Sequence, residues 1–308
     1  EGAMPEGNRR QAMVPSGARV LENTRGSAPG LWLDEGDAVI VLLPGPPREL
    51  NPMLSALVSG PLRERSGHAP IIRRVLKIAG RIESQTDEAL HPLYLEWERA
   101  TPSVSATILA ALGQIELHLS TRAPSNDAAV RSLDRATDRV LQIIGADVFS
   151  TDGRSMEAVV GDMLSVRGWR IALAESCTGG LLTSRLTDVP GSSQYVIEAV
   201  VAYANQAKTD LLGVPPSLIE THGAVSEPVA IAMADGVRAR AGVEVGVGVT
   251  GIAGPGGGSA DKPVGTVMIA TSTASGTAVR TFRFHGERDQ VKFQASQAAL
   301  DMVRRMLR

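Results

Sequence analysis

The sequence predicts an α/β protein built in three parts. Residues 154–308 alternate predicted strands and helices, which is typical of a three-layer α/β/α sheet. Residues 67–150 combine a hairpin with two helices, which predicts a small α+β unit. A length of 308 residues also exceeds that of most single domains. We therefore expect domains at 1–66, 67–150 and 151–308.

Residues 1–66 resemble the end of an α/β domain. Asp37–Leu43 is an apolar run followed by Pro44-Gly45-Pro46-Pro47, which predicts a buried strand and a sharp turn. Arg48–Val58 predicts a short helix. Because a buried parallel strand needs neighbours and covering helices, we expect its partners upstream of Glu1. The chain starts with Glu rather than Met, so we expect it to be a piece of a longer protein.

The middle part is expected to combine three strands with two helices. The predicted strands are Ile71–Ile78, Ser103–Ala110 and Gln114–Ser120, and the predicted helices are Glu83–Arg99 and Asp127–Ile144. The last two strands form a hairpin around Leu112-Gly113. Thr151-Asp152-Gly153 is the expected linker to the third part.

The third part is expected to be a complete domain. Its predicted strands are Arg170–Ala174, Val196–Ala204, Val243–Val249, Val264–Ala274 and Thr277–Phe284. Its predicted helices begin near Ser155 and at residue 178, Asn205, Ser226 and Glu287. Ser226 is expected to cap its helix, with Pro228 in the first turn.

Composition excludes several classes of protein. A net charge of −2 and a pI of about 6.3 argue against a general nucleic-acid binder. No apolar run reaches the roughly 20 residues of a membrane helix, and no signal peptide is visible. The single cysteine, Cys177, forms no internal disulfide and suits the cytoplasm. None of the five histidines has a partner at metal-ligand spacing, so we expect no metal.

The first chemical candidate is the segment Ala174-Glu175-Ser176-Cys177-Thr178-Gly179-Gly180. A strand runs into Ser176, and a helix begins after the two glycines. Free N–H groups at such a turn can bind an anion or hold a developing oxyanion. A plain helix cap explains the same residues about equally well.

The second candidate is the segment Tyr203-Ala204-Asn205-Gln206-Ala207-Lys208, at the end of the next strand. In a parallel sheet it would approach Ser176. The chain has only four lysines against 27 arginines, so each lysine is a candidate for chemistry that arginine cannot perform. A desolvated lysine can act as the base for a serine nucleophile. Taken alone, a solvated helix lysine is the more common interpretation.

Two further segments carry features of phosphate binding. A glycine-rich loop, with Thr250, Gly251, Gly254 and Gly256, follows a predicted strand and lacks the Walker A ending. Arg288 and Lys292 lie four residues apart on the last helix and face the same way. The alternatives are a flexible surface loop and ordinary surface charge.

Together, the segments AESCTGG, YANQAK, HGAVSEPVA, TGIAGPGGGSADKPVGTV and FHGERDQV resemble the CinA carboxy-terminal domain over residues 155–308. Residues 4–11, 24–30 and 43–47 resemble the end of the molybdopterin-binding-like domain of full-length CinA proteins, some of which have ADP-ribose pyrophosphatase activity. The glycine-rich phosphate loop of that domain is absent here, and Lys292 stands where relatives often have arginine.

The resemblance implies a nicotinamide-nucleotide amidase. Such an enzyme converts nicotinamide mononucleotide (NMN) and water into nicotinate mononucleotide and ammonia, in pyridine-nucleotide salvage. Ser176 would be the nucleophile and Lys208 its base. The expected site residues in addition to these are Tyr203 and Asn205 at the pyridinium and carboxamide, the N–H groups of Thr178, Gly179 and Gly180 at the oxyanion, and Thr250, Gly251, Gly254, Gly256 and Arg288 at the ribose phosphate.

Several alternatives stay open from the sequence. Cys177 is the rival nucleophile, because thiolates attack amides well. A pyrophosphatase acting through the first part and a non-catalytic nucleotide sensor linked to competence are the competing functions. We expect no cofactor, a small-molecule nucleotide as the partner, no nucleic acid or membrane, and a homodimer.

Overall fold

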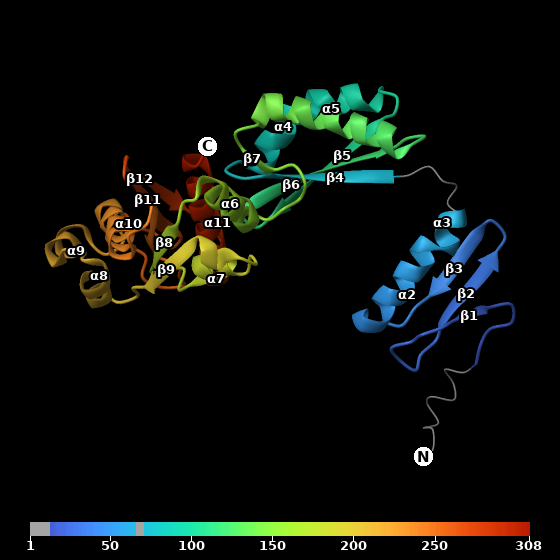
Figure 1. Ribbon diagram of the computed structural model, residues 1–308, viewed down its shortest axis with the longest axis horizontal. Helices are drawn as coiled ribbons and strands as arrows, with labels where there is room; N and C mark the ends of the chain where they lie inside the picture. The colour runs from blue at the N-terminus through green and yellow to red at the C-terminus, as the bar shows by residue number, and fades with distance from the viewer. Residues whose placement is uncertain (1–12, 66–70) are drawn as a thin grey trace, which may run out of the picture. The chain divides into compact units, whose positions relative to one another are not determined.

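The computed structural model describes residues 13–65 and 71–308 (Figure 1). The chain divides into two compact units, 1–70 and 71–308. Residues 4–11, which carry part of the resemblance, and the expected boundary at 66/67 lie outside the described residues. The division into three domains stays a prediction.

The first unit is a small antiparallel sheet with two helices. Its elements are β1 (Arg19–Leu21), β2 (Gly30–Glu35), β3 (Ala38–Leu42), α2 (Pro47–Ser59) and α3 (Pro61–Arg65). The strands follow the order β1-β2-β3. The helix predicted at 48–58 is confirmed by α2.

The strand predicted at 37–43 exists, but its expected environment is wrong. β3 pairs antiparallel with β2, and it is not a buried parallel strand. Ile40 and Leu42 are about half exposed on it. The turn at Gly36 places β2 next to β3. The apolar run was therefore wrongly interpreted as a parallel strand buried on both faces. β1 and β2 were not predicted, because residues 19–35 show no sustained alternation.

The middle of the chain forms a four-stranded antiparallel sheet beneath two helices. Its elements are β4 (Ile71–Ile78), α4 (Glu83–Glu98), β5 (Val104–Ala111), β6 (Gln114–Arg122), α5 (Asn126–Ile144) and β7 (Val148–Ser150). The order β5-β6-β4-β7 with this βαββαβ succession is the ferredoxin-like arrangement. Leu76, Leu117, Leu133 and Val140 share its core. The predicted hairpin and both helices are confirmed, whereas the three-residue strand β7 was not predicted.

The last part is a mixed five-stranded sheet in the order β12-β11-β10-β8-β9. Its strands are β8 (Ile171–Glu175), β9 (Val196–Val201), β10 (Val245–Gly251), β11 (Thr266–Thr273) and β12 (Gly276–Arg283). β8 lies parallel to both β9 and β10, while β11 and β12 continue the sheet antiparallel.

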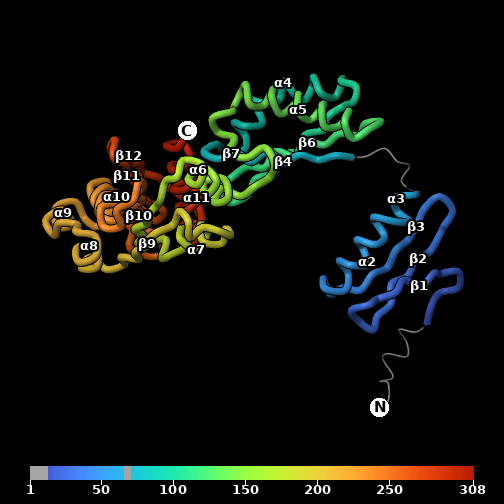
Figure 2. The backbone as a smooth tube through the Cα atoms, in the orientation of Figure 1, coloured from blue at the N-terminus to red at the C-terminus, as the bar shows by residue number. Residues whose placement is uncertain are grey.

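Helices cover both faces of this sheet, as Figures 1 and 2 show. The helices are α6 (Met156–Arg167), α7 (Leu181–Thr187), α8 (Asn205–Leu212), α9 (Pro216–His222), α10 (Glu227–Ala241) and α11 (Arg288–Met306), with a short 3₁₀ turn, η1 (Ser192–Gln194). α6, α7 and α11 pack on Ile171, Leu173 and Val247. α8 and α10 pack on Ala172 and Ala174, on the opposite face. The three-layer α/β/α prediction is confirmed.

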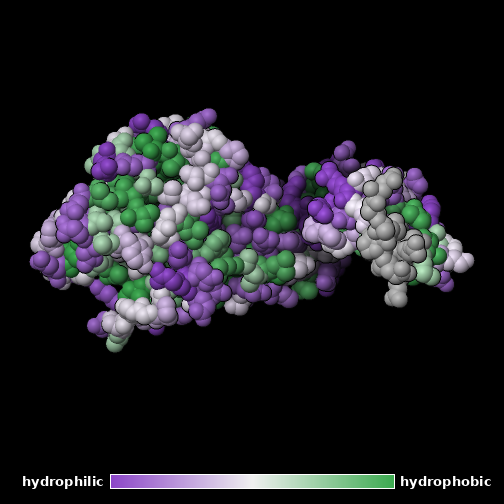
Figure 3. All heavy atoms as spheres, turned by 90° about the horizontal axis from the view of Figure 1, so that it is seen from below, coloured by the Kyte–Doolittle hydropathy of each residue, from purple (hydrophilic) through white to green (hydrophobic). Residues whose placement is uncertain are grey.

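Alternate residues of β8 therefore point into two different cores, and each is fully buried. That explains why β8 reads as a continuous apolar run rather than an alternating one. On the face seen in Figure 3, hydrophilic and hydrophobic side chains are interspersed over this unit. Among 13–65 and 71–308, no helix is long and apolar enough to cross a membrane.

One predicted detail of the helices is wrong. Ser226 occupies the N-cap position of α10, but its hydroxyl donates to the Gly223 carbonyl and caps no N–H group. The hydroxyl thus closes the turn before the helix. The short helix α9 was also not predicted, since Pro215 and Pro216 suggest a loop.

Candidate active site

The parallel strands β8, β9 and β10 end at one edge of the sheet and position the candidate residues. Ser176 follows β8, Tyr203 lies two residues past β9, and Thr250 lies near the end of β10. The Ser176 N–H donates to the Val249 carbonyl (2.9 Å). The Ala202 N–H donates to the Glu175 carbonyl (2.8 Å). The backbone on both sides of the Glu175–Ser176 bond is therefore fixed to the two neighbouring strands.

A cavity of about 270 Å³ opens at this edge. Its lining residues come from the ends of the three strands, the glycine-rich loop, the loop before α10 and the start of α11. They are Ser176, Cys177, Tyr203, Asn205, Lys208, Ala224, Val225, Thr250, Gly251, Ile252, Ala253, Gly254, Gly256, Gly257 and Arg288. The structure thus brings together most of the residues singled out in the sequence. Their roles in a reaction stay predictions.

Lys208 and Ser176 form the central pair. Lys208 lies one turn into α8, is only 1% exposed, and turns back towards the strand end. Its Nζ lies 3.2 Å from Ser176 Oγ, 2.9 Å from the Ala202 carbonyl oxygen and 3.2 Å from the Tyr203 carbonyl oxygen. The solvated-lysine alternative is therefore wrong for Lys208.

Burial, rather than these partners, favours the neutral amine, because carbonyl oxygens also accept from the ammonium form. Burial lowers the pKa of Lys208, and no carboxylate opposes that shift; the smaller opposing effect comes from Cys177. A neutral amine has two N–H groups and one lone pair. When the two carbonyls accept its N–H groups, the lone pair faces the one partner that can donate, the Ser176 hydroxyl. This arrangement suits proton abstraction from Ser176.

Cys177 also lines the cavity, but it is a poor nucleophile there. Burial raises the pKa of its thiol to about 12; the Glu175 charge raises the pKa as well, while the Cys177 backbone and the charges of Lys208 and Arg288 lower it. The thiolate is the reactive form of cysteine. With a pKa this high, almost no thiolate is present at neutral pH.

We therefore expect Cys177→Ala to keep amide hydrolysis within about threefold of the wild-type rate, the scale of a small packing change rather than a lost nucleophile. Ammonia release by the two proteins at neutral pH is the measurement. Loss of the activity in a folded Cys177→Ala protein would transfer the nucleophile assignment to the thiol.

The predicted oxyanion donors at Thr178, Gly179 and Gly180 are not equally available. The Gly179 N–H donates to the Ser176 carbonyl (3.1 Å), and the Gly180 N–H donates to Glu175 Oε2 (3.0 Å). Neither glycine lines the cavity. Within the described chain, the N–H groups of Cys177 and Thr178 have no hydrogen-bond partner. Of the three predicted donors, Thr178 therefore keeps a free N–H group, and Cys177, which was not predicted as a donor, adds a second.

Thr178 itself is not on the cavity wall. Its side chain is fully buried, and its hydroxyl has no partner among the residues that the structure describes. Thr250 lines the cavity, but its hydroxyl donates to the Ala224 carbonyl (2.8 Å) and holds the loop before α10 in place. Thr250 therefore shapes the site through its hydroxyl, whereas Thr178 offers the cavity no side-chain contact.

Arg288 connects three parts of the cavity mouth. Its guanidinium donates to the Gly254 carbonyl (2.6 Å) and to the Tyr203 hydroxyl (2.7 Å). Gly254 has a φ of +88°, which lets the loop turn its carbonyl towards α11. Tyr203 is 60% exposed and Asn205 is also exposed, so both face incoming solute. Lys292, which the sequence paired with Arg288, lies beside Gly179 and does not line the cavity.

Sequence reasoning missed two contributions. Ala224 and Val225 line the cavity from the loop before α10, although HGAVSEPVA was among the segments singled out. Glu175 was read only as part of its segment, yet its carboxylate takes the N–H groups at the start of α7. A buried acid directly before the serine was the available signal. Outside the gaps at 1–12 and 66–70, no group of three or more His, Cys, Asp or Glu side chains could hold a metal ion.

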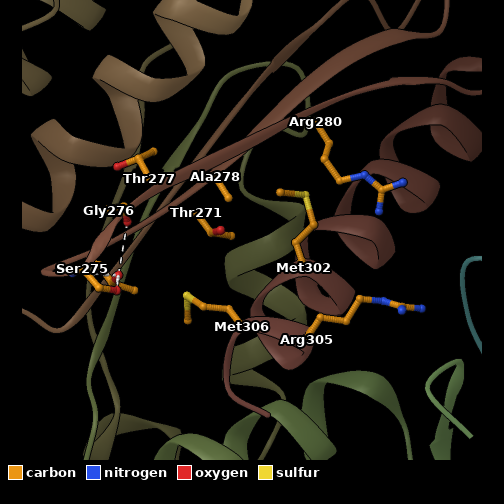
Figure 4. Close-up of a pocket in the computed structure, with 10 residues that line it drawn as sticks. Thr271, Ser275, Gly276, Thr277, Ala278, Arg280, Met302, Arg305 and Met306 are labelled. Atoms are coloured by element: carbon orange, nitrogen blue, oxygen red, sulfur yellow. Dashed lines mark hydrogen bonds between the residues drawn. The ribbon is translucent and has the colours of Figure 1, made fainter.

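Other cavities in the second unit have a different character. Figure 4 shows one of about 550 Å³, lined by Arg280, Met302, Met306 and the turn around Gly276. Met302 lies about four turns beyond Arg288 along α11, or ~21 Å. This cavity shares no residue with the one at Ser176. The larger cavity holds no serine–lysine pair, so size alone does not locate the chemistry.

Comparison with known proteins assigns the family. The model of the CinA C-terminal domain matches residues 153–307. A "CinA-like protein" of Koribacter versatilis is 46% identical over 308 residues, covering 99% of this chain and 73% of that protein. A second, of Acidobacterium capsulatum, is 45% identical over 304 residues, covering 97% and 72%.

A solved structure is also similar in sequence. The competence/damage inducible protein CihA from Agrobacterium tumefaciens is 40% identical, covers 48% of this chain and 90% of its own, and has a TM-score of 0.47. The family model matches the part of the chain that holds Ser176, Lys208 and Arg288, and the relatives match nearly all of it. The chain therefore belongs to the CinA family.

Proposed function

We propose that this chain hydrolyses the carboxamide of NMN to nicotinate mononucleotide and ammonia. The observation that carries the proposal is the buried contact of 3.2 Å between Lys208 Nζ and Ser176 Oγ. A serine whose hydroxyl faces a desolvated lysine is an activated nucleophile for acyl transfer. The resemblance of the surrounding segments to nicotinamide-nucleotide amidases supports the choice of substrate.

The first half of the reaction forms an acyl-enzyme. Ser176 Oγ attacks the carboxamide carbon while Lys208 Nζ takes the hydroxyl proton, and the carbonyl oxygen becomes an oxyanion. The free N–H groups of Cys177 and Thr178 stabilise that charge. The C–N bond then breaks, Lys208 returns its proton to the departing nitrogen, and ammonia leaves. Ser176 is now esterified by the nicotinoyl group.

The second half restores the enzyme. Lys208 takes a proton from water, whose oxygen attacks the ester carbon. The bond to Ser176 Oγ breaks, the proton on Lys208 returns to Oγ, and the carboxylic acid that forms gives its remaining proton to solvent and leaves as nicotinate mononucleotide. Each step moves one proton through Lys208, so the amine must be neutral at the start of each attack. Among the titratable residues that line the cavity, Lys208 is the one that the structure hydrogen-bonds to Ser176 Oγ.

The substrate's remaining groups fit the cavity mouth. Tyr203 offers an exposed ring for the flat, positively charged pyridinium, since cations bind aromatic faces. Asn205 offers an amide to the carboxamide. The glycine-rich loop and Arg288 offer backbone N–H groups and a guanidinium to the phosphate.

Ammonia release from NMN by the purified chain tests the function directly. Release that depends on Ser176 and Lys208 is the expected result. Binding of NMN without ammonia release would contradict hydrolysis and favour a nucleotide sensor.

We expect Arg288→Met to raise KM for NMN by about 10- to 100-fold, because charge-assisted hydrogen bonds to phosphate contribute ~1.5–3 kcal/mol. The effect should disappear with nicotinamide riboside, which lacks the phosphate. Steady-state kinetics on both substrates is the measurement. Arg280→Met, at the cavity of Figure 4, is the matched control, and an equal loss on both substrates would contradict phosphate binding.

We expect kcat/KM for NMN to increase with pH. Burial lowers the pKa of Lys208, so the neutral base appears as pH rises through that lowered value, below the ordinary lysine range. The unfolded chain binds this proton more tightly than the folded one, so the free energy of unfolding increases with pH from the lowered pKa up to the ordinary lysine value. A pH–rate profile is the measurement. A rate that falls as this group loses its proton would contradict the base assignment.

A further inference from the structure

Glu175, the residue before the proposed nucleophile, has an unusual set of partners. It ends β8, is fully buried, and has no side-chain cation bonded to its carboxylate within the described chain. One oxygen accepts from the N–H groups of Gly180 (3.0 Å) and Leu182 (3.1 Å). The other accepts from the N–H (2.8 Å) and the hydroxyl (2.5 Å) of Thr183. Four donors therefore satisfy one buried negative charge.

These bonds close the loop that contains Ser176. The carboxylate spans from the end of β8 to the first turn of α7 and acts as its N-terminal cap, where a negative charge is stabilised by the helix dipole. Gly180, the N-cap residue, has no side chain to do this. The four residues between, 176–179, are held at both ends, and their conformation depends on the carboxylate.

The same bonds decide which donors are left for a ligand. The N–H groups at the start of α7 already donate to the Glu175 carboxylate, so they are not available to a substrate anion. The N–H groups of Cys177 and Thr178 stay unpaired within the closed loop. The Glu175 backbone carbonyl also accepts from Ala202, next to the carbonyls that hold Lys208. One residue is thus bonded to the nucleophile loop, to α7 and to the strand end that holds the base.

We propose that Glu175 is a positioning residue for the acyl transfer: its carboxylate holds the 176–179 loop so that Ser176 faces Lys208 and the free N–H groups face the oxyanion. This inference rests on the proposed function, in which Ser176 is the nucleophile. Glu175 touches neither substrate nor reacting atoms. Its charge also helps to keep the Cys177 thiol protonated, in agreement with a serine nucleophile.

The test uses Glu175→Gln in the full chain. Glutamine keeps the shape, but it removes the charge and turns an NH₂ group towards N–H donors. We expect kcat for NMN to fall by about 100-fold, the scale of a lost oxyanion donor, with KM within about threefold. The rate at which a fluorophosphonate labels Ser176 should fall in parallel, since that reaction needs the same loop and no NMN.

Two further variants separate positioning from folding. Thr183→Val removes only the hydroxyl donor, keeps the three N–H bonds, and should lower kcat and the labelling rate by about fivefold. If Glu175→Gln fails to fold, Thr183→Val tests the positioning role of Glu175 in its place. Asp301→Asn, another buried carboxylate, bonded to Arg304 and Arg305, should lower Tm and leave kcat and labelling unchanged.

The outcomes distinguish the two proposals. Wild-type kcat and labelling in folded Glu175→Gln, or in Thr183→Val, would overturn the role of Glu175. Labelling of wild-type Ser176 without ammonia from NMN would overturn the substrate, while the labelling rates would still test Glu175. If the wild-type chain showed no labelling and released no ammonia, both proposals would be overturned.

Discussion

Ser176→Ala is expected to lower ammonia release from NMN by about 10⁴-fold or more, the scale found when a nucleophile is removed from a catalytic unit. The substitution deletes one oxygen atom and leaves the backbone bonds of residues 175 and 176 to β9 and β10 intact. Lys208 keeps both carbonyl partners. The loss should therefore come from chemistry, with little change in Tm or in NMN binding.

The measurement is single-turnover ammonia release, with NMN binding followed by calorimetry. Ser192→Ala is a matched control, because Ser192 is also a buried serine of this unit but lies outside the cavity. Full activity in folded Ser176→Ala would rule out this serine as the nucleophile.

Lys208→Met and Lys208→Arg are both expected to lower kcat by about 10³- to 10⁴-fold, the upper range for general acid–base catalysis. Methionine matches the length of lysine and has no amine. Arginine retains the positive charge, but a guanidinium does not lose its proton near neutral pH. If Lys208 serves as a base, the two variants should be equally impaired. If it supplied only a positive charge, arginine would restore most of the rate.

The pH–rate profile adds a second readout for the same residue. The increase of kcat/KM with pH should be absent from the residual activity of both variants. Lys77→Met is the matched control, since Lys77 lies on the ferredoxin-like sheet beside Glu116 and should keep the wild-type profile. A substantial rate in Lys208→Arg with the profile unchanged would contradict proton transfer by Lys208.

Much of the fold follows from local patterns. α5 could be predicted because Val140 and its helical neighbours face one core, and β4 because isoleucine and valine recur along it. β7 could not be predicted, since three residues carry too little periodicity. β3 was placed in the wrong environment because an apolar run does not state its pairing partner or direction.

The site was predictable where chain position implies spatial position. Parallel strands end at one edge, so Ser176 and Lys208 were expected to meet, and the structure brings them together. The Gly180 N–H was expected to be free for an oxyanion, because the sequence does not reveal that Glu175 accepts from it. The contact of Arg288 with Tyr203 also joins residues far apart in sequence, which no local pattern encodes.

The helix α11 contacts the candidate active site at one end and the ferredoxin-like sheet at the other. Its first residue, Arg288, lies at the mouth of the cavity, while Arg304 and Arg305 in its last turn, and Arg308 just beyond it, bind the backbone and Asp147 around β7. α11 runs without interruption over ~28 Å between these two ends. The guanidinium that we assign to the phosphate and the arginines that hold the ferredoxin-like sheet are thus joined through one continuous helix.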